Sequence, residues 1–587
     1  MNRAITAAAA GLLLAALPCV AAHGGGHAQT EQNDVLAVGA EAQDVTPTYF
    51  RHPDHAGWVY AHIALMIVAW VVVLPPALML NVARSRYQLQ AQLLFHVVNA
   101  LGLFTGLIYN QSTPDLYVTN SHHPVGWVVT ALAVTWTLLS LTTVCTAKMK
   151  RHELKYSPRT FHQDVSDDGD IHQYLDNPSS YRFSSDSGNF TAGSRTDSSD
   201  SIFHVNKASP VPSRDEQEPG DWERNGDTEK SGFLDHNEHG RMIARAIRLV
   251  SNQRVSSLVR FGQASLEKVL LLFGFLAITT GFVVYGGLFQ KREIFSGLAH
   301  FVKGGIFFWY GLLTLGRWMG AFVEYGWAWN IRPKHPLVSK WKSRIPSAEF
   351  TESFVIWLYG ASNVFLEHLN NWGGEWSPQD FEHVSITILF FGGGLFGMAI
   401  ESRAWREVTG VPTWLHKEKD NEDDVSGFRV ISEPLSHSDQ RWQRPSSYDV
   451  PLNPIPALTI MFLGMMMSGH HQSSMVSTMM HAQWGLLFTG FAVSRAVTYL
   501  MLYIKPPTSH YPSRPPSELV AAFCLTAGGL LFMNSAHDSV AAIEGNGLDA
   551  MTVFTLTIGL TGILLAWELV CFTIKGWAMS KEQSSAR

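Results

Sequence analysis

Apolar runs of about 20 residues recur along this chain and constrain its fold more than any other feature. A helix of that length crosses the roughly 30 Å hydrocarbon core of a bilayer, and lipid offers no partner to an unpaired backbone amide. Charged residues make up only 16% of the 587 residues, too few to coat a water-soluble body of this length. The sequence therefore predicts an all-α polytopic membrane protein with about eleven transmembrane helices in two groups. These helices are expected at 58–82, 90–110, 124–146, 265–288, 297–316, 351–369, 380–400, 453–468, 477–503, 517–533 and 550–574.

Polar stretches separate the apolar groups and predict the domain organisation. Arg3 and the apolar run from Ala4 to Leu17 are typical of a cleaved signal peptide. The segments rich in Ser, Asp, Asn and Gly cannot bury enough apolar surface to fold alone. The predicted order is a signal peptide at 1–22, a lumenal or extracellular segment at 23–56, a three-helix transmembrane domain at 57–147, a disordered cytosolic linker at 148–245, and a C-terminal transmembrane domain at 246–580 with a disordered cytosolic loop near 403–451.

The basic residues predict the orientation in the membrane. If the mature N-terminus lies outside the cytosol, nearly all basic loop residues fall in cytosolic loops, as the positive-inside rule requires. The C-terminus is then cytosolic, and the protein is expected in the endomembrane system or at the cell surface. The residues that carry this pattern are Arg84, Arg86, Lys148, Lys150, Arg151, Arg317, Arg332, Lys334, Lys340, Lys342, Arg344, Arg403, Arg406, Lys505, Arg514, Lys575 and Lys581, against the outside pair Lys291 and Arg292.

Several function classes find no support in the sequence. A formal net charge of -6 without a basic stripe argues against nucleic-acid binding. The four cysteines lie in the signal peptide or near apolar helices, which does not suggest a disulfide framework. No nucleophile with a neighbouring base and no phosphate or dinucleotide loop is apparent, so no catalytic residue is assigned. The expected surroundings are the lipid bilayer, and the linker is a candidate docking segment for protein partners.

Histidines gather at the predicted outer ends of the helices. Neutral imidazoles that project from neighbouring helices at equal depth can hold a b-type haem as axial ligands. His62 and His122 fit this pattern because both lie near the outer ends of helices that run in the same direction. His96 is a further candidate ligand, although the helix at 265–288 offers no histidine to pair with it.

A second hypothesis is a transition-metal or proton site in the C-terminal group of helices. Imidazole and carboxylate ligands suit zinc, iron or copper, and ionisable groups at the edge of hydrocarbon usually face a bundle interior or a water-filled cavity. The candidate ligands are His300, His368, Asp380, His383, His470, His471 and His481. At the cytosolic ends of helices we expect structural ion pairs between Glu324 and Arg317 and between Glu401 and Arg403.

Two resemblances accompany these patterns. The run HIALMIVAWVVVLPPALML resembles the opening of transmembrane b-type cytochromes that act as ferric reductases. Taken whole, the chain resembles the fungal Ytp-like transmembrane proteins, through HIALMIVAW and LLFHVVNALG in its first part and HFVKGGIFFWYGLLTLGRWMGAF and SGHHQSSMVSTMMHAQWGLLF in its second. The first implies haem-based electron transfer, and the second implies a membrane protein without an assigned activity. Three functions remain open: electron transfer, metal or proton transport, and a non-catalytic scaffolding role.

Overall fold

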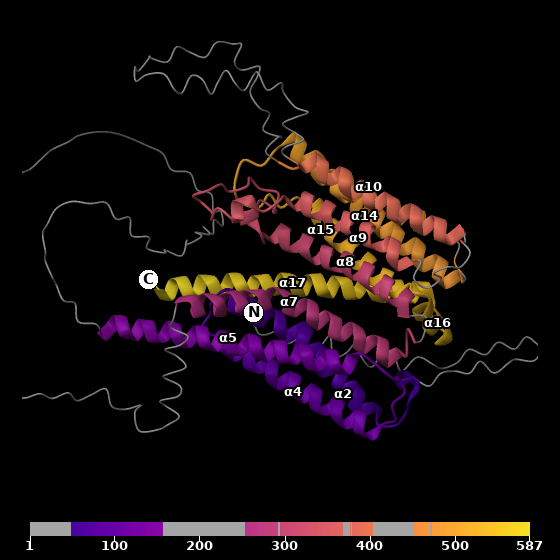
Figure 1. The fold of residues 1–587 in the computed structure, drawn as a ribbon, viewed down its shortest axis with the longest axis horizontal. Helices are drawn as coiled ribbons and strands as arrows, with labels where there is room; N and C mark the ends of the chain where they lie inside the picture. The colour runs from indigo at the N-terminus through magenta and orange to yellow at the C-terminus, as the bar shows by residue number, and fades with distance from the viewer. Residues whose placement is uncertain are drawn as a thin grey trace, which may run out of the picture. The chain divides into compact units, whose positions relative to one another are not determined.

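The structure is a computed structural model that describes residues 48–156, 253–290, 294–367, 376, 378–402, 450–469, 472 and 474–586. The predicted signal peptide, most of the predicted linker and nearly all of the predicted loop at 403–451 lie outside these ranges. The described part consists of helices and their connections, with no strand among them. The helices are η1 (Tyr49–Arg51), α2 (Ala56–Ile67), η2 (Val68–Val73), α3 (Leu74–Val82), α4 (Gln88–Ser112), α5 (His122–Tyr156), α7 (Gln253–Gly286), α8 (Ile294–Met319), η4 (Val323–Tyr325), η5 (Lys342–Arg344), α9 (Ala348–Glu367), α10 (Pro378–Glu401), α13 (Ile455–Ser468), α14 (Met475–Ile504), α15 (Ser517–Asn534), α16 (His537–Gly545) and α17 (Ala550–Ala586) (Figure 1).

The predicted helical membrane fold is confirmed. Each apolar run found in the sequence coincides with a described helix or, for the first run, with the continuous segment α2–η2–α3. Within the described chain, 9 spans are long and apolar enough to cross a membrane. The helices α9 and α13 are not among them, and α13 has only 14 residues. The short helix α16 was not predicted.

The first span contains a π-helical turn, η2, immediately before two prolines. The backbone amide of Leu74 donates to the carbonyl of Ala69, which is the wider spacing of a π turn. Pro75 and Pro76 follow, and neither has an amide hydrogen to donate. The carbonyls one turn earlier therefore need partners from other helices.

The C-terminal helices pack through small residues and aromatic rings. α8 packs against α15, α15 against α14, α14 against α13, and α9 against α10 (Figure 1). At the α8–α15 contact, a Cβ on Gly304 would lie 2.6 Å from the carbonyl oxygen of Gly529, so the two backbones touch. Small residues allow such close contact in lipid, where packing replaces the hydrophobic drive. Trp484, Phe488 and Phe532 are central members of the buried apolar core.

The described residues fall into two compact units. The described residues within Met1–Val129 and Leu272–Arg587 form one unit, and those within Thr130–Leu271 form the other. The first unit includes α2, α3 and α4 together with the C-terminal helices, because α17 packs against α3 as well as against α8, α14 and α15. In the second unit, Thr143 Oγ1 donates to Gln263 Oε1 at 2.9 Å and joins α5 to α7. Helix α5 continues to Tyr156, into the segment predicted as linker.

Candidate functional site

His62 and His122 face each other near the first turns of α2 and α5. Their ring centroids are 6.3 Å apart and their planes are nearly perpendicular, at 79°. His62 Nδ1 lies 2.8 Å from the carbonyl oxygen of Gly102, so the proton of its neutral ring belongs on Nδ1. His122 Nδ1 lies 3.2 Å from Thr280 Oγ1. Each ring is thus held through Nδ1, and the backbone of Ala277 is a further hydrogen-bond partner of His122. In His62, Nε2 is left as the nitrogen available to a ligand.

Glycines on the neighbouring helices make room for both rings. A Cβ on Gly106 of α4 would lie 2.6 Å from His62 Nδ1. A Cβ on Gly281 of α7 would lie 3.0 Å from His122 Cε1. One turn after His122, a Cβ on Gly126 would meet no described atom within 4 Å. Four helices therefore surround the pair, and a larger residue at Gly106 or Gly281 would displace an imidazole.

His96 is not a third member of this pair. It lies on α4 six residues before Gly102, about 9 Å along a helix. Its ring packs against the ring of Phe95, with centroids 5.1 Å apart. The structure thus brings together two of the three histidines proposed for haem.

A second pair of histidines lies among the C-terminal helices. The rings of His300 on α8 and His481 on α14 have centroids 6.4 Å apart. His481 is 2% exposed, and its Nδ1 lies 2.8 Å from the carbonyl of Ser477. The rings of Trp484 and Phe532 stack beside the pair, with centroids 4.5 Å apart. His300 therefore packs against the ring of Phe532, and His481 packs against the ring of Trp484.

The other proposed metal ligands are placed only in part. Asp380 and His383 lie in the first two turns of α10. His368, His470 and His471 lie outside the described residues. Among the described residues, no three His, Cys, Asp or Glu side chains come close enough to share one metal ion. The seven-residue set as a whole stays a prediction.

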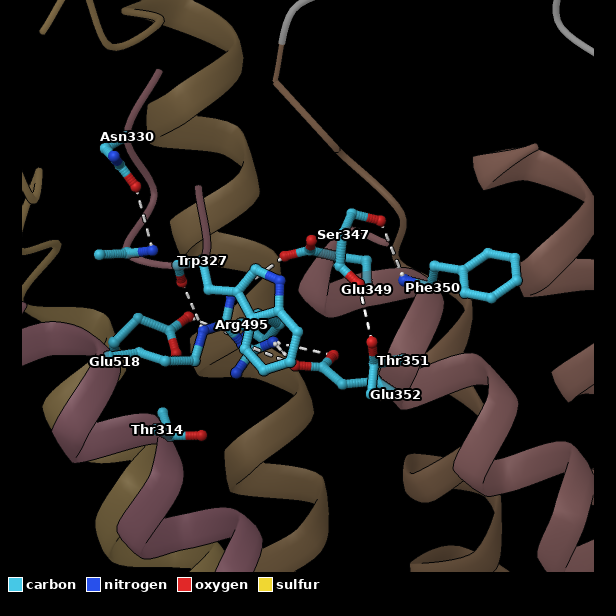
Figure 2. Close-up of polar contacts among 12 residues, drawn as sticks. Thr314, Trp327, Asn330, Ser347, Glu349, Phe350, Thr351, Glu352, Arg495 and Glu518 are labelled. Atoms are coloured by element: carbon cyan, nitrogen blue, oxygen red, sulfur yellow. Dashed lines mark hydrogen bonds and ion pairs between the residues drawn. The ribbon is translucent and has the colours of Figure 1, made fainter. Parts of the chain in front are cut away.

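At the opposite ends of α8 and α14, the structure buries a cluster of five charged side chains. Arg317 Nη1 donates to Glu352 Oε1 at 2.7 Å, and Arg317 Nη2 lies 3.3 Å from Glu349 Oε1. Arg495 Nη1 lies 3.4 Å from Glu352 Oε2, and Arg495 Nε lies 2.8 Å from Glu518 Oε1. Figure 2 shows Arg495 between Glu518 and Glu352. We call these five residues the charge cluster.

The segment between α8 and α9 covers the charge cluster. Arg317 Nε donates to the carbonyl of Trp327 at 2.6 Å. The indole of Trp329 lies 4.3 Å from the Arg317 guanidinium carbon and 5.7 Å from that of Arg495, measured to the ring centroid. Cation–π contact is strong where water is excluded. Both arginines are therefore fixed by this segment as well as by the glutamates.

The predicted ion pair between Arg317 and Glu324 is wrong. Phe322 adopts a left-handed conformation with φ 61°, and the chain turns there into η4. Glu324 Oε1 instead lies 3.1 Å from Lys342 Nζ, while Arg317 pairs with glutamates of α9. Glu401 Oε2 accepts a hydrogen bond from Ser347 Oγ at 2.8 Å, and its predicted partner Arg403 lies outside the described residues.

Sequence reasoning missed the charge cluster, although a signal for it was present. Arg495 lies within the apolar run at 477–503, and Glu518 opens the next run. Ionisable residues in such positions usually face a bundle interior and pair with one another. The signal identifies the residues, but it does not identify their partners.

These apolar helices, with their polar side chains turned toward one another, define a polytopic α-helical membrane protein. The chain belongs to the family described as protein YTP1-like, C-terminal, whose model matches residues 273–576. A second model, a domain of unknown function (DUF2427), matches residues 43–146.

Three relatives come from fungi, and two of them are described as membrane proteins. The chain is 32% identical over 532 residues to an uncharacterised membrane protein of Schizosaccharomyces pombe, covering 89% of this chain and 95% of that protein. It is 36% identical over 328 residues to an uncharacterised membrane protein of Saccharomyces cerevisiae, covering 54% of this chain and 48% of that protein. Protein YTP1 of Saccharomyces cerevisiae is 22% identical over 343 residues, which cover 57% of this chain and 60% of YTP1. No solved structure matches the chain.

Proposed function

We propose that this membrane protein transfers electrons through one b-type haem held between His62 and His122. The observation that carries the proposal is the separation of the two imidazoles, 6.3 Å between ring centroids. Metal–imidazole bonds of about 2 Å place the centres of two rings on opposite sides of one metal roughly 6 Å apart. The pair therefore has the spacing of two axial ligands.

The contacts of the two rings also support a ligand role. A metal-binding histidine usually donates its other ring N–H to a carbonyl, carboxylate or similar acceptor, which fixes the tautomer and the ring orientation. Gly102 provides a carbonyl for His62, and Thr280 provides a hydroxyl for His122. Gly106 and Gly281 keep the space that the rings occupy. The four helices thus fix the positions of both rings.

A haem at this position would supply reversible one-electron chemistry. The residues of the chain would bind it, orient it and shield it from water. Because His96 lies apart from the pair, this proposal gives one haem per chain rather than two.

Optical spectra of purified variants test this proposal. With haem supplied during expression, we expect the wild-type protein to show a reducible Soret band at about one haem per chain. His62→Ala and His122→Ala should each lower the haem content at least tenfold, because a single imidazole is a much weaker ligand set. His123→Ala is the matched control, since His123 is the exposed neighbour of His122. His96→Ala should also keep the band.

Two outcomes would refute the haem proposal. One is a wild-type protein, folded by size-exclusion chromatography, that carries no haem when haem is supplied. The other is a Soret band that survives both His62→Ala and His122→Ala unchanged.

The second histidine pair favours a second candidate function, the binding of a transition-metal ion for transport. His300 and His481 offer two imidazole nitrogens at neighbouring positions, which suits zinc or copper. Elemental analysis would compare the wild type with His300→Ala and His481→Ala. Equal metal content in all three proteins would exclude this site. Absence of both haem and metal would leave a non-catalytic role.

A further inference from the structure

The charge cluster holds more carboxylates than arginines. Two guanidinium groups, Arg317 and Arg495, meet three carboxylates, Glu349, Glu352 and Glu518. The side chains are 1% exposed for both arginines and 3%, 10% and 0% exposed for the three glutamates in that order. If all five were ionised, one negative charge would stay uncompensated in a buried environment. Such a charge is strongly unfavourable, and a carboxyl group avoids it by retaining a proton.

The distances indicate which carboxylate is in excess. Glu352 bridges both arginines through its two oxygens. Glu518 lies 2.8 Å from Arg495. Glu349 has the longest contact with Arg317, 3.3 Å, and it shares that guanidinium with Glu352, whose contact is shorter. Glu349 is therefore the one glutamate of the cluster that contacts a single guanidinium and has the longer of that guanidinium's two carboxylate contacts.

The groups around Glu349 add more negative than positive charge. Glu401 of α10 is close enough to interact electrostatically with Glu349. The hydroxyl group of Ser347 donates a hydrogen bond to the carboxylate of Glu401. α9 itself contributes Glu352, α8 contributes Arg317, α14 contributes Arg495 and Tyr499, and α15 contributes Glu518, so three carboxylates face two guanidinium groups. Like charges at close range cannot all ionise in a buried site. The neighbours thus favour a neutral Glu349.

Five buried polar atoms in or beside the cluster have no hydrogen-bond partner in the described part of the chain. They are Oε1 and Oε2 of Glu518, Nε and Nη2 of Arg495, and Oη of Tyr310. The Tyr310 ring lies 5.8 Å from the Arg495 guanidinium carbon, so Tyr310 belongs to the surroundings of Arg495. Buried polar groups without a partner are uncommon and often lie at functional sites.

We propose that the charge cluster is a proton-binding site and that Glu349 carries the proton. The site is separate from both histidine pairs and depends on neither haem nor metal. Ionisable groups of this kind in membrane proteins form proton relays. Release of the proton would leave two adjacent carboxylates, Glu349 and Glu352, competing for Arg317, which also holds the covering segment through Trp327. Proton exchange is thereby linked to the packing of that segment on α8 and α9.

Glu349→Gln and Glu352→Gln together test the proposal. Glutamine imitates a neutral carboxyl group and cannot ionise in the unfolded chain, so Glu349→Gln should melt at or above the wild-type temperature in detergent at pH 6. Glu352→Gln removes the carboxylate that bridges both arginines and should lower the melting temperature by several degrees. The stabilising proton on Glu349 is present at low pH and is lost as the pH rises. The wild type should therefore lose stability between about pH 4.5 and pH 7 more steeply than Glu349→Gln.

Infrared spectroscopy gives an independent measurement. The buried carboxyl group of Glu568 on α17 also has an oxygen without a hydrogen-bond partner and can contribute a protonated-carboxyl band of its own, so the measurement is a difference spectrum between the wild type and each variant. At pH 6 the difference for Glu349→Gln should contain the carbonyl stretch of one protonated carboxyl group, and the difference for the matched control Glu401→Gln should not. The proposal is overturned if Glu349→Gln fails to fold or melts as low as Glu352→Gln, or if its difference spectrum contains no such band.

Discussion

At the residue scale, Trp567 closes a gap in the hydrogen bonding of the first span. Pro75 has no amide hydrogen, so the carbonyl of Val71, four residues earlier, lacks its helical donor. The indole Nε1 of Trp567 on α17 donates to that carbonyl at 2.8 Å. An interhelical donor of this kind lets a proline-containing helix persist in a bilayer. The proline thus creates a specific contact between η2 and α17.

Replacing Trp567 with phenylalanine should therefore destabilise the protein. The substitution keeps an aromatic ring but leaves the Val71 carbonyl without a donor, at a cost of about 1 kcal/mol. The matched control is Trp577→Phe on the same helix, whose indole is 50% exposed. Thermal melting in detergent would compare the two variants. Equal melting temperatures would show that the hydrogen bond contributes nothing to stability.

At the element scale, close backbone contact decides which helices pair. Gly304 of α8 faces Gly529 of α15, and a Cβ on Gly304 would also lie 2.8 Å from the amide nitrogen of Met533. Both neighbours are backbone atoms, which cannot move aside as a flexible side chain can. This contact positions α8, and α8 carries both His300 and Arg317. The packing of small residues thus supports the second histidine pair and the charge cluster.

Gly304→Ala should lower stability by about 1–3 kcal/mol because the added methyl group overpacks the α8–α15 contact. Gly559→Ala on α17 is the control, since a Cβ there meets no described atom within 4 Å. That variant should melt at or slightly above the wild-type temperature, because alanine favours a helix more than glycine does. A Gly304→Ala protein as stable as Gly559→Ala would contradict the close contact.

At the scale of the whole molecule, α17 packs against helices from both predicted transmembrane domains. α17 packs against α3 near the beginning of the chain and against α8, α14 and α15. The compact unit that contains them therefore includes helices from both predicted transmembrane domains. The two histidine pairs and the charge cluster all lie within this unit. The basic residues of the loops predict its orientation in the membrane.

Cysteine labelling in sealed microsomes, which expose their cytosolic face, tests that orientation. Asn546 lies in the predicted outer connection between α16 and α17, and Tyr511 lies in the predicted cytosolic connection between α14 and α15; both are exposed. A membrane-impermeant maleimide should label Tyr511→Cys directly and Asn546→Cys only after the membrane is opened. Wild-type protein controls for the native cysteines, of which Cys524 and Cys571 are buried. The reverse labelling pattern would invert the predicted topology.

The sequence by itself determined the helices, because an apolar run long enough to cross a bilayer has no alternative to a helix. It also identified His62 and His122 as neighbours, since two histidines near the same ends of helices that run in the same direction must lie at similar depth. The contacts of Gly106 with His62 and of Gly281 with His122 could not be predicted in this way. Hydropathy locates a helix along the chain but does not determine how the helix is rotated about its own axis.

Only the tertiary structure decided which charged groups meet. Arg317 and Glu324 are close in the chain, yet the turn at Phe322 directs Glu324 toward Lys342 and leaves Arg317 to Glu349 and Glu352. Arg495 and Glu518 come from separate helices and join the same cluster through the packing of α14 against α15. A buried charge without a partner is strongly unfavourable, so each buried charged group pairs with another. The rotation and packing of the helices determine which groups are close enough to pair.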